Sequence, residues 1–98
     1  MDTMKFSYPE AKRPMAGRAH VGVVASGDME VLIEGLEIGS ATVSVTTSVK
    51  GFEATWKAVF DRFFSRFDGA VHIVIQDAGA TPGSVTLRLQ QAVEVLSQ

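Results

Sequence analysis

Apolar and polar residues follow two different spacings along the chain. Period-two alternation or short apolar runs, typical of strands, occupy residues 20–25, 29–34, 41–49 and 70–77. Spacings of three and four, typical of amphipathic helices, occupy residues 52–67 and 82–96. The predicted order is β-β-β-α-β-α. It indicates an α+β fold, an open two-layer α/β sandwich whose mostly antiparallel four-stranded sheet carries two helices on one face.

The first two strands predict a β-hairpin around the polar break Ser26-Gly27-Asp28. A two-residue turn at Ser26-Gly27 would set Val23 opposite Glu30 and mix buried with solvated positions. A three-residue loop sorts the faces better. It pairs Ala25 with Met29, Val23 with Val31, Val21 with Ile33, Val24 with Glu30, Gly22 with Leu32 and His20 with Glu34. In this register Ser26 stands first in an exposed tip, and Gly27 leaves its hydroxyl accessible.

Residues 41–49 show the most regular alternation, which predicts one buried and one exposed sheet face. The buried set is Val43, Val45, Thr47 and Val49, and the exposed set is Thr42, Ser44, Thr46 and Ser48. On the exposed face, Val24, Leu32 and Val74 would form an apolar docking patch. The alternative is that a second layer or the N-terminal arm covers these side chains.

The first helix carries an aromatic stripe. Its apolar positions are Phe52, Trp56, Val59, Phe60, Phe63 and Phe67. A base-stacking platform is one interpretation, but the helical spacing favours core packing. Asp68-Gly69 is expected to end this helix, with Gly69 in a left-handed cap.

The second helix is predicted to begin with Thr81 as N-cap and Pro82 at its first position. Val85, Leu87 and Leu89 also alternate at period two, which would suit a strand. Length and the capping signal favour the helix.

Residues 1–19 form an N-terminal arm of the single domain expected over residues 1–98. Met4, Phe6 and Tyr8 alternate with polar residues, which allows a short edge strand ended by Pro9. Residues 10–18 resemble a surface connection. Their basic side chains could contact phosphates, but a solvated loop is the favoured interpretation.

Composition narrows the class of protein. The chain has 98 residues, a formal net charge of −2 and no cysteine. These values exclude a disulfide framework and a cysteine nucleophile, and no block of like charge suggests nucleic acid or membrane as a partner. Neither a signal segment nor a membrane-spanning run is evident, so a cytoplasmic protein is expected.

Assigning strand directions places three segments at one edge of the sheet. They are the Ser26 tip, the start of the first helix near Lys50-Gly51, and the loop of residues 77–83. Two helix N-termini with unpaired N–H groups therefore open toward Ser26, and Lys50 adds positive charge, which suits a phosphate. We prefer the order 3-2-1-4 for the four predicted strands, because it sets the last strand beside the first.

Neither histidine is expected to activate Ser26. His20 begins the first strand, about six residues or ~20 Å from Ser26, and His72 begins the last strand at the opposite edge. A serine hydrolase needs a histidine within hydrogen-bond reach, and two scattered histidines form no metal site. We find no catalytic constellation, so Ser26 is interpreted as an acceptor of a group.

Three stretches resemble the malonate decarboxylase delta-subunit family of acyl carrier proteins. They are ASGDMEVLIE (25–34), TSVKG (47–51) and DAGATPGSVTLRLQQAV (77–93), and the similarity covers nearly the whole chain. A more distant likeness is to the citrate lyase gamma chain. Two positions depart from the family pattern: Ala78, where an aromatic residue is common, and Lys50, where asparagine is.

The resemblance implies a covalent cofactor. In this family the serine before Gly-Asp, here Ser26, carries 2'-(5''-phosphoribosyl)-3'-dephospho-CoA through a phosphodiester, and its thiol carries acetyl and malonyl groups. Gly27 and Asp28 would support the turn. Contacts to the arm are expected from Lys50, Gly51, Gly79 and Thr81.

The implied partners are the acyltransferase and decarboxylase subunits and a prosthetic-group transferase. The chain itself would be a non-catalytic carrier. Two other hypotheses stay open: a non-covalent scaffold or ligand-binding subunit in which Ser26 only makes a turn, and a small serine esterase.

Overall fold

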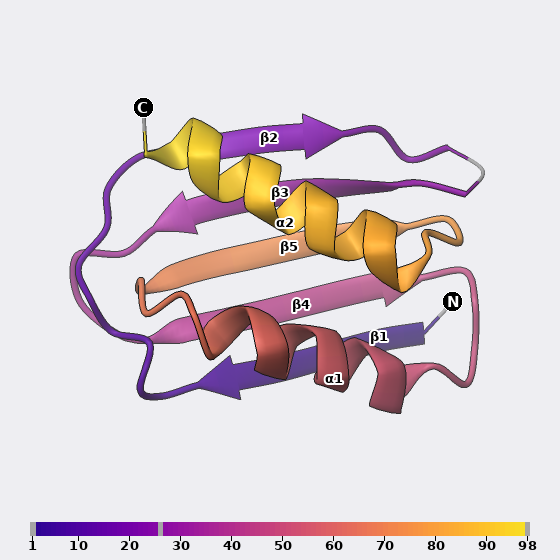
Figure 1. Cartoon of the computed structure of the whole chain (residues 1–98), viewed down its shortest axis with the longest axis horizontal. Helices are drawn as coiled ribbons and strands as arrows, with labels where there is room; N and C mark the ends of the chain where they lie inside the picture. The colour runs from indigo at the N-terminus through magenta and orange to yellow at the C-terminus, as the bar shows by residue number, and fades with distance from the viewer. Residues whose placement is uncertain (1, 26, 98) are drawn as a thin grey trace.

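The computed structural model describes residues 2–25 and 27–97, so Ser26 lies outside the described residues. Two helices cover one face of a five-stranded sheet (Figure 1). This is the predicted α+β, two-layer architecture with one additional strand. The elements in chain order are β1 (Asp2–Tyr8), β2 (Arg18–Gly22), β3 (Met29–Gly35), β4 (Ala41–Thr47), α1 (Glu53–Phe64), β5 (Val71–Asp77) and α2 (Pro82–Leu96).

The additional strand is β1, which forms one edge of the sheet and pairs antiparallel with β4. Its alternating pattern follows the prediction. Met4, Phe6 and Tyr8 are half-buried toward the helices, and the residues between them are exposed. Tyr8 stacks on Phe64 of α1 with ring centroids 4.3 Å apart, so the strand is part of the packed layer rather than a loose arm.

The strand order is β1-β4-β5-β3-β2, which corrects the order that we preferred. The last strand, β5, lies between β4 and β3 and not beside β2. The physical reason is that β4, α1 and β5 form a parallel crossover whose strands are direct neighbours. Both lateral positions of β5 are therefore paired, and β2 becomes an edge strand.

The β2–β3 hairpin pairs two residues away from the predicted register. Val21 pairs with Val31 and His20 with Leu32, so the connection spans residues 23–28. Gly22 ends the strand at a φ of 80°, which turns the chain away from the ladder. Val23 and Val24 consequently lie in the loop and are exposed, and Val24 is not part of the sheet's open face.

The core lies between the sheet and the two helices. It is built from the alternate, fully buried positions of β3, β4 and β5 together with the inner stripes of α1 and α2. On the helices the buried residues are Trp56, Phe60, Val85, Leu89, Ala92 and Leu96. Trp56 and Phe60 of the aromatic stripe are thus core, as predicted, whereas Phe52 precedes α1 and is half exposed. The segment containing Val85, Leu87 and Leu89 is helical, also as predicted.

The first helix ends earlier than expected. Its C-cap is Ser65, and Gly69 does not adopt a positive φ. Gly69 instead forms an isolated β-bridge with Arg13. A Cβ on Gly69 would collide with the ring of Phe67 and the side chain of Met15. The predicted left-handed cap at Gly69 is therefore wrong, and this glycine serves a close approach between segments.

Candidate functional site: the hairpin loop at the edge of the sheet

Three connections meet at one edge of the sheet, as the strand directions predicted. They are the β2–β3 loop, the β4–α1 connection and the β5–α2 loop, and both helices begin there (Figure 1). Ala25 and Gly27, the sequence neighbours of Ser26, are exposed. The candidate site is therefore described through the residues on either side of Ser26.

The β2–β3 loop is tied to the β5–α2 loop by backbone hydrogen bonds. The Gly27 N–H donates to the carbonyl oxygen of Ala78 over 2.7 Å, and the Ala78 N–H donates to the carbonyl oxygen of Asp28 over 2.9 Å. Within the loop, the Asp28 N–H donates to Ala25 over 2.9 Å. Four backbone groups of three loop residues, Ala25, Gly27 and Asp28, are therefore held by bonds within the hairpin and to the β5–α2 loop.

Two glycines meet where these loops touch. A Cβ placed on Gly79 would lie 3.9 Å from the Gly27 nitrogen, and one placed on Gly27 would have no atom within 4 Å. Both residues have a positive φ, 78° for Gly27 and 95° for Gly79. The space beside Ser26 in the sequence is consequently open, which fits the predicted supporting role of Gly27.

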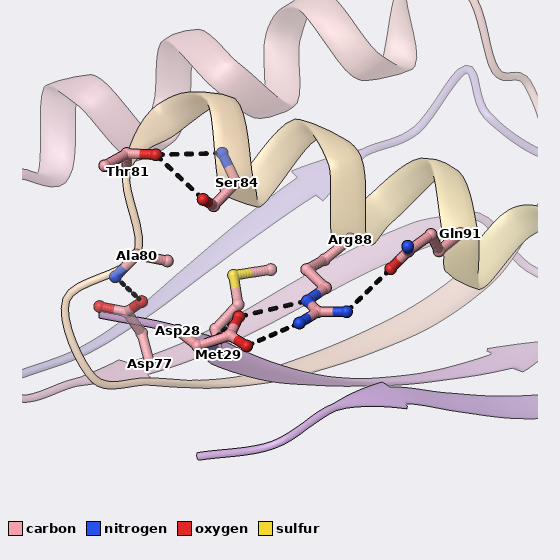
Figure 2. Close-up of polar contacts among 8 residues, drawn as sticks. All are labelled: Asp28, Met29, Asp77, Ala80, Thr81, Ser84, Arg88 and Gln91. Carbon is pink, nitrogen blue, oxygen red and sulfur yellow. Dashed lines mark hydrogen bonds and ion pairs between the residues drawn. The ribbon is translucent and has the colours of Figure 1, made fainter. Parts of the chain in front are cut away.

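Asp28 forms an ion pair that the sequence did not reveal. Its Oδ2 accepts a 2.6 Å hydrogen bond from Nη2 of Arg88 in α2, and its Oδ1 accepts from Nε of Arg88 and from the N–H of Met29 (Figure 2). Both side chains are about one quarter exposed. The Arg88 hydrogen bonds, followed by that from Met29, hold the pKa of Asp28 below its ordinary value.

Asp77, at the end of β5, fixes the second loop. Its buried carboxylate accepts hydrogen bonds from the Thr47 hydroxyl (2.8 Å), the Gly79 N–H (3.0 Å) and the Ala80 N–H (3.0 Å). Figure 2 shows Asp77 below the start of α2, with its bond to Ala80. This carboxylate connects β4 to the β5–α2 loop, and that loop in turn is hydrogen-bonded to Gly27. Asp77 therefore stabilises the hairpin loop indirectly.

Of the four predicted arm contacts, Gly79 and Thr81 belong to the β5–α2 loop, which is hydrogen-bonded to the β2–β3 loop. Thr81 caps α2 by accepting a hydrogen bond from the Ser84 N–H (Figure 2). Lys50 is exposed, and Gly51 borders a hollow with Asp2–Met4 of β1. Because β1 and β2 are opposite edges of the sheet, Gly51 is directed away from the hairpin loop.

An apolar cleft of about 250 Å³ separates the starts of α1 and α2. Phe52, Trp56 and Val59 line one side, and Ala80, Pro82 and Val85 line the other. Gly79 lines this cleft and directly follows Ala78, which is hydrogen-bonded to Gly27. The cleft therefore opens next to the loop that carries Ser26.

The histidines have side-chain partners of their own. His72 Nδ1 lies 2.7 Å from the Thr42 hydroxyl, and His20 Nε2 lies 3.3 Å from Glu30. His72 pairs with Glu34 and Thr42, at the opposite end of β5 from Asp77. Among residues 2–25 and 27–97, no three metal-ligating side chains gather, and neither helix could cross a membrane.

Arg88, Ala78 and Asp77 support the site and were missed as site residues. Arg88 follows Val85 by three positions and precedes Ala92 by four, so it lies on the flank of the buried stripe. A charged residue in that position signals a partner on the sheet below it. The chain gives no local signal for the backbone role of Ala78.

Comparison with known proteins adds sequence evidence. A family model described as malonate decarboxylase delta subunit (MdcD) matches residues 16–96. The malonate decarboxylase acyl carrier protein of Pseudomonas putida strain GB-1 is 49% identical over 98 residues, covering 99% of this chain and 98% of its own length. The protein of that name from Azotobacter vinelandii strain DJ is 45% identical over 98 residues with the same coverage.

A solved structure agrees with the sequence comparisons. A chain in the crystal structure of a Pseudomonas malonate decarboxylase hetero-tetramer in complex with malonate is 45% identical, with a TM-score of 0.91. The alignment covers 98% of this chain and 99% of that one. The protein described here therefore belongs to the malonate decarboxylase delta-subunit family, the acyl carrier proteins of that enzyme.

Proposed function

We propose that this chain carries acetyl and malonyl thioesters on a phosphoribosyl-dephospho-CoA arm, joined to Ser26 by a phosphodiester. The supporting observation is the loop itself: an open glycine beside Ser26, exposed neighbours, and a backbone fixed by hydrogen bonds to a second loop. Such a loop presents a hydroxyl reproducibly to another enzyme while leaving room for a bulky substituent.

The residues present fit the proposed arm. Gly27 leaves space next to the attachment point, and α2 begins at Thr81–Pro82, shortly after Ala78, which is hydrogen-bonded to Gly27. When bound, the arm supplies the thiol that holds the acyl group. The chain's own contribution is to position Ser26 and the root of the arm.

We infer a non-catalytic role and several protein partners. His72 lies within hydrogen-bond distance of Thr42, and His20 Nε2 lies 3.3 Å from the Glu30 carboxylate, so the geometry supports group carriage over an esterase. Because the related chain belongs to a hetero-tetramer, we propose that this carrier meets acyltransferase and decarboxylase subunits, and also a transferase that attaches the arm.

Intact-mass measurement tests the attachment. Protein co-expressed with its cognate transferase should gain the mass of one arm, and Ser26→Ala should abolish the gain. Ser48→Ala is the matched control, because Ser48 is an exposed serine on the same edge. Modification that survives Ser26→Ala, or full malonate decarboxylation by a complex containing unmodified Ser26→Ala protein, would contradict the proposal.

A further inference from the structure

The cleft between α1 and α2 combines properties that a carrier surface does not require. It is apolar, about 250 Å³ in volume, and bordered by Phe52, a residue that is 50% exposed. Trp56 and the hydroxyl-bearing residues Thr55 and Thr81 also line the cleft. Aromatic walls with a few polar groups are typical of small-molecule sites, although this volume is just below the roughly 300–1,000 Å³ of drug-sized ligands.

We propose that this cleft binds the adenine base of the covalent arm. The inference rests on the arm assigned to Ser26 under Proposed function. In this site the base would lie between Phe52 and Trp56 on one side and Ala80 and Pro82 on the other. The thiol end of the arm remains free to move between enzymes.

The position of the cleft favours binding of the part of the arm that lies nearest to its attachment at Ser26. Gly79 lines the cleft, and the residue before it, Ala78, accepts a hydrogen bond from the N–H of Gly27, which follows Ser26 directly. In covalent order from Ser26, the ribosyl-adenosine part precedes the pantetheine chain. The part of the arm that passes the cleft first is therefore the nucleoside.

The apolar and aromatic lining of the cleft favours the adenine base over the other parts of the arm. A flat π system can stack on the exposed ring of Phe52 without regard to its hydrogen-bonding edge. The phosphates of the arm are strongly hydrated and do not suit apolar walls. Pantetheine has many rotatable bonds whose ordering opposes binding.

The tether makes a weak site sufficient. A group held by a short flexible link experiences an effective concentration in the millimolar range. Free dephospho-CoA at micromolar concentration should therefore leave the cleft empty, whereas the attached arm should occupy it.

Isotope-filtered NMR on the loaded protein tests the proposal. The protein is labelled with ¹³C and ¹⁵N, the arm is unlabelled, and intact mass first establishes that Ser26 carries it. We expect NOEs from adenine H2 and H8 to the rings of Phe52 and Trp56. NOEs from the pantoyl methyl groups instead, or none from the arm, would overturn the cleft assignment and leave attachment standing. An arm that is absent from Ser26 would instead overturn the proposed function.

Fluorescence of Trp56, the chain's single tryptophan, gives a second readout. Loading the arm should lower its emission, while equimolar free dephospho-CoA on the unloaded protein should not. In Phe52→Leu, loss of stacking should weaken docking by roughly fivefold or more and reduce the quenching. Leu87→Ala is the control, because Leu87 is 53% exposed and does not line the cleft. Equal quenching in all three loaded proteins would contradict a role for Phe52.

Discussion

At the hairpin loop, a single residue both supports the local turn and makes a contact with a distant part of the chain. Asp28 was predicted to support a turn, and it does accept a hydrogen bond from the neighbouring Met29 N–H. It also pairs with Arg88, which is 60 residues away in the sequence. A turn preference follows from local backbone chemistry, whereas a partner at that separation depends on which strand lies under which helix. Sequence reasoning therefore identified the residue and missed half of its role.

We expect Asp28→Asn to alter the pH dependence of stability. The folded pKa of Asp28 is below its ordinary value of 3.8, so its stabilising effect is complete well above pH 3.8 and is lost as the pH falls through the folded pKa. Asparagine does not titrate in this range. The variant should be less stable than the wild type at pH 7, and the difference should narrow below about pH 4.

Denaturant midpoints at pH 7 and pH 3 measure this effect. Asp61 and Asp68 also have lowered pKa values, because Lys57 and Arg13 hydrogen-bond to them, so the wild type alone cannot isolate Asp28. The difference between variant and wild type does isolate it. A difference that is equal at both pH values would contradict the ion-pair account.

Gly22→Ala should destabilise the protein by more than about 2 kcal/mol. A left-handed backbone costs roughly 1–2 kcal/mol for a residue with a Cβ, and at Gly22 that Cβ would also collide with the Met29 carbonyl oxygen. Gly39→Ala is the control, since its φ is 111° but no atom lies within 4 Å. Equal losses in urea unfolding would refute the collision.

Each element shows what hydrophobic periodicity can and cannot determine. The buried faces of β3 and β4 and the helical state of α2 were predicted correctly, because buried positions repeat with the element's own period. Val49 was also assigned to the buried face, but it lies beyond the end of β4 and is exposed. The hairpin register was wrong by two residues. Since side chains alternate with a period of two, registers two residues apart bury the same faces, and only the turn distinguishes them. Here Gly22 and the bonds to Ala78 decide the turn.

Trp56→Ala tests the inner stripe of α1. Trp56 is 6% exposed and stacks on Phe60 with centroids 5.8 Å apart. Its truncation should cost about 3–5 kcal/mol, measured by chemical denaturation. Leu87→Ala, on the outer face of α2, should change stability by no more than about 0.5 kcal/mol. A loss below about 1 kcal/mol for Trp56→Ala would place that side chain outside the core.

Thr81→Ala tests the start of α2. The Thr81 side chain accepts from the Ser84 N–H, and Pro82 already supplies the first helical position. Loss of this cap should cost about 0.5–2 kcal/mol. Thr81→Ser keeps the oxygen and should retain most of the stability in thermal unfolding. If serine and alanine behave alike, the cap is not the relevant interaction.

At the scale of the whole molecule, strand order was the main error. Periodicity assigns faces but does not name lateral neighbours, so β2 was placed where β3 lies, beside β5. The available signal was the crossover β4–α1–β5, since parallel strands joined by one helix are usually neighbours. The edge location of the candidate site was nevertheless predicted correctly, because it depends on strand direction alone.

Removal of residues 1–9 should destabilise the protein and promote self-association. β1 covers the lateral edge of β4, and Phe6 packs on Phe60 with centroids 5.2 Å apart. An uncovered strand edge pairs readily with another chain. Light scattering should show larger species than for the full chain. Phe6→Ala, which keeps the strand, should lose stability without this association; association in both variants would contradict the edge explanation.

The Ser26 loop owes its form to contacts outside its own hairpin, chiefly Ala78 and Arg88. A short synthetic peptide copied from residues 20–34 would lack both. It should therefore be a poor acceptor for the proposed transferase, and this sequence would not serve as a transplantable labelling tag. A useful miniature would have to retain α2 and the strand beneath it, which is most of the domain.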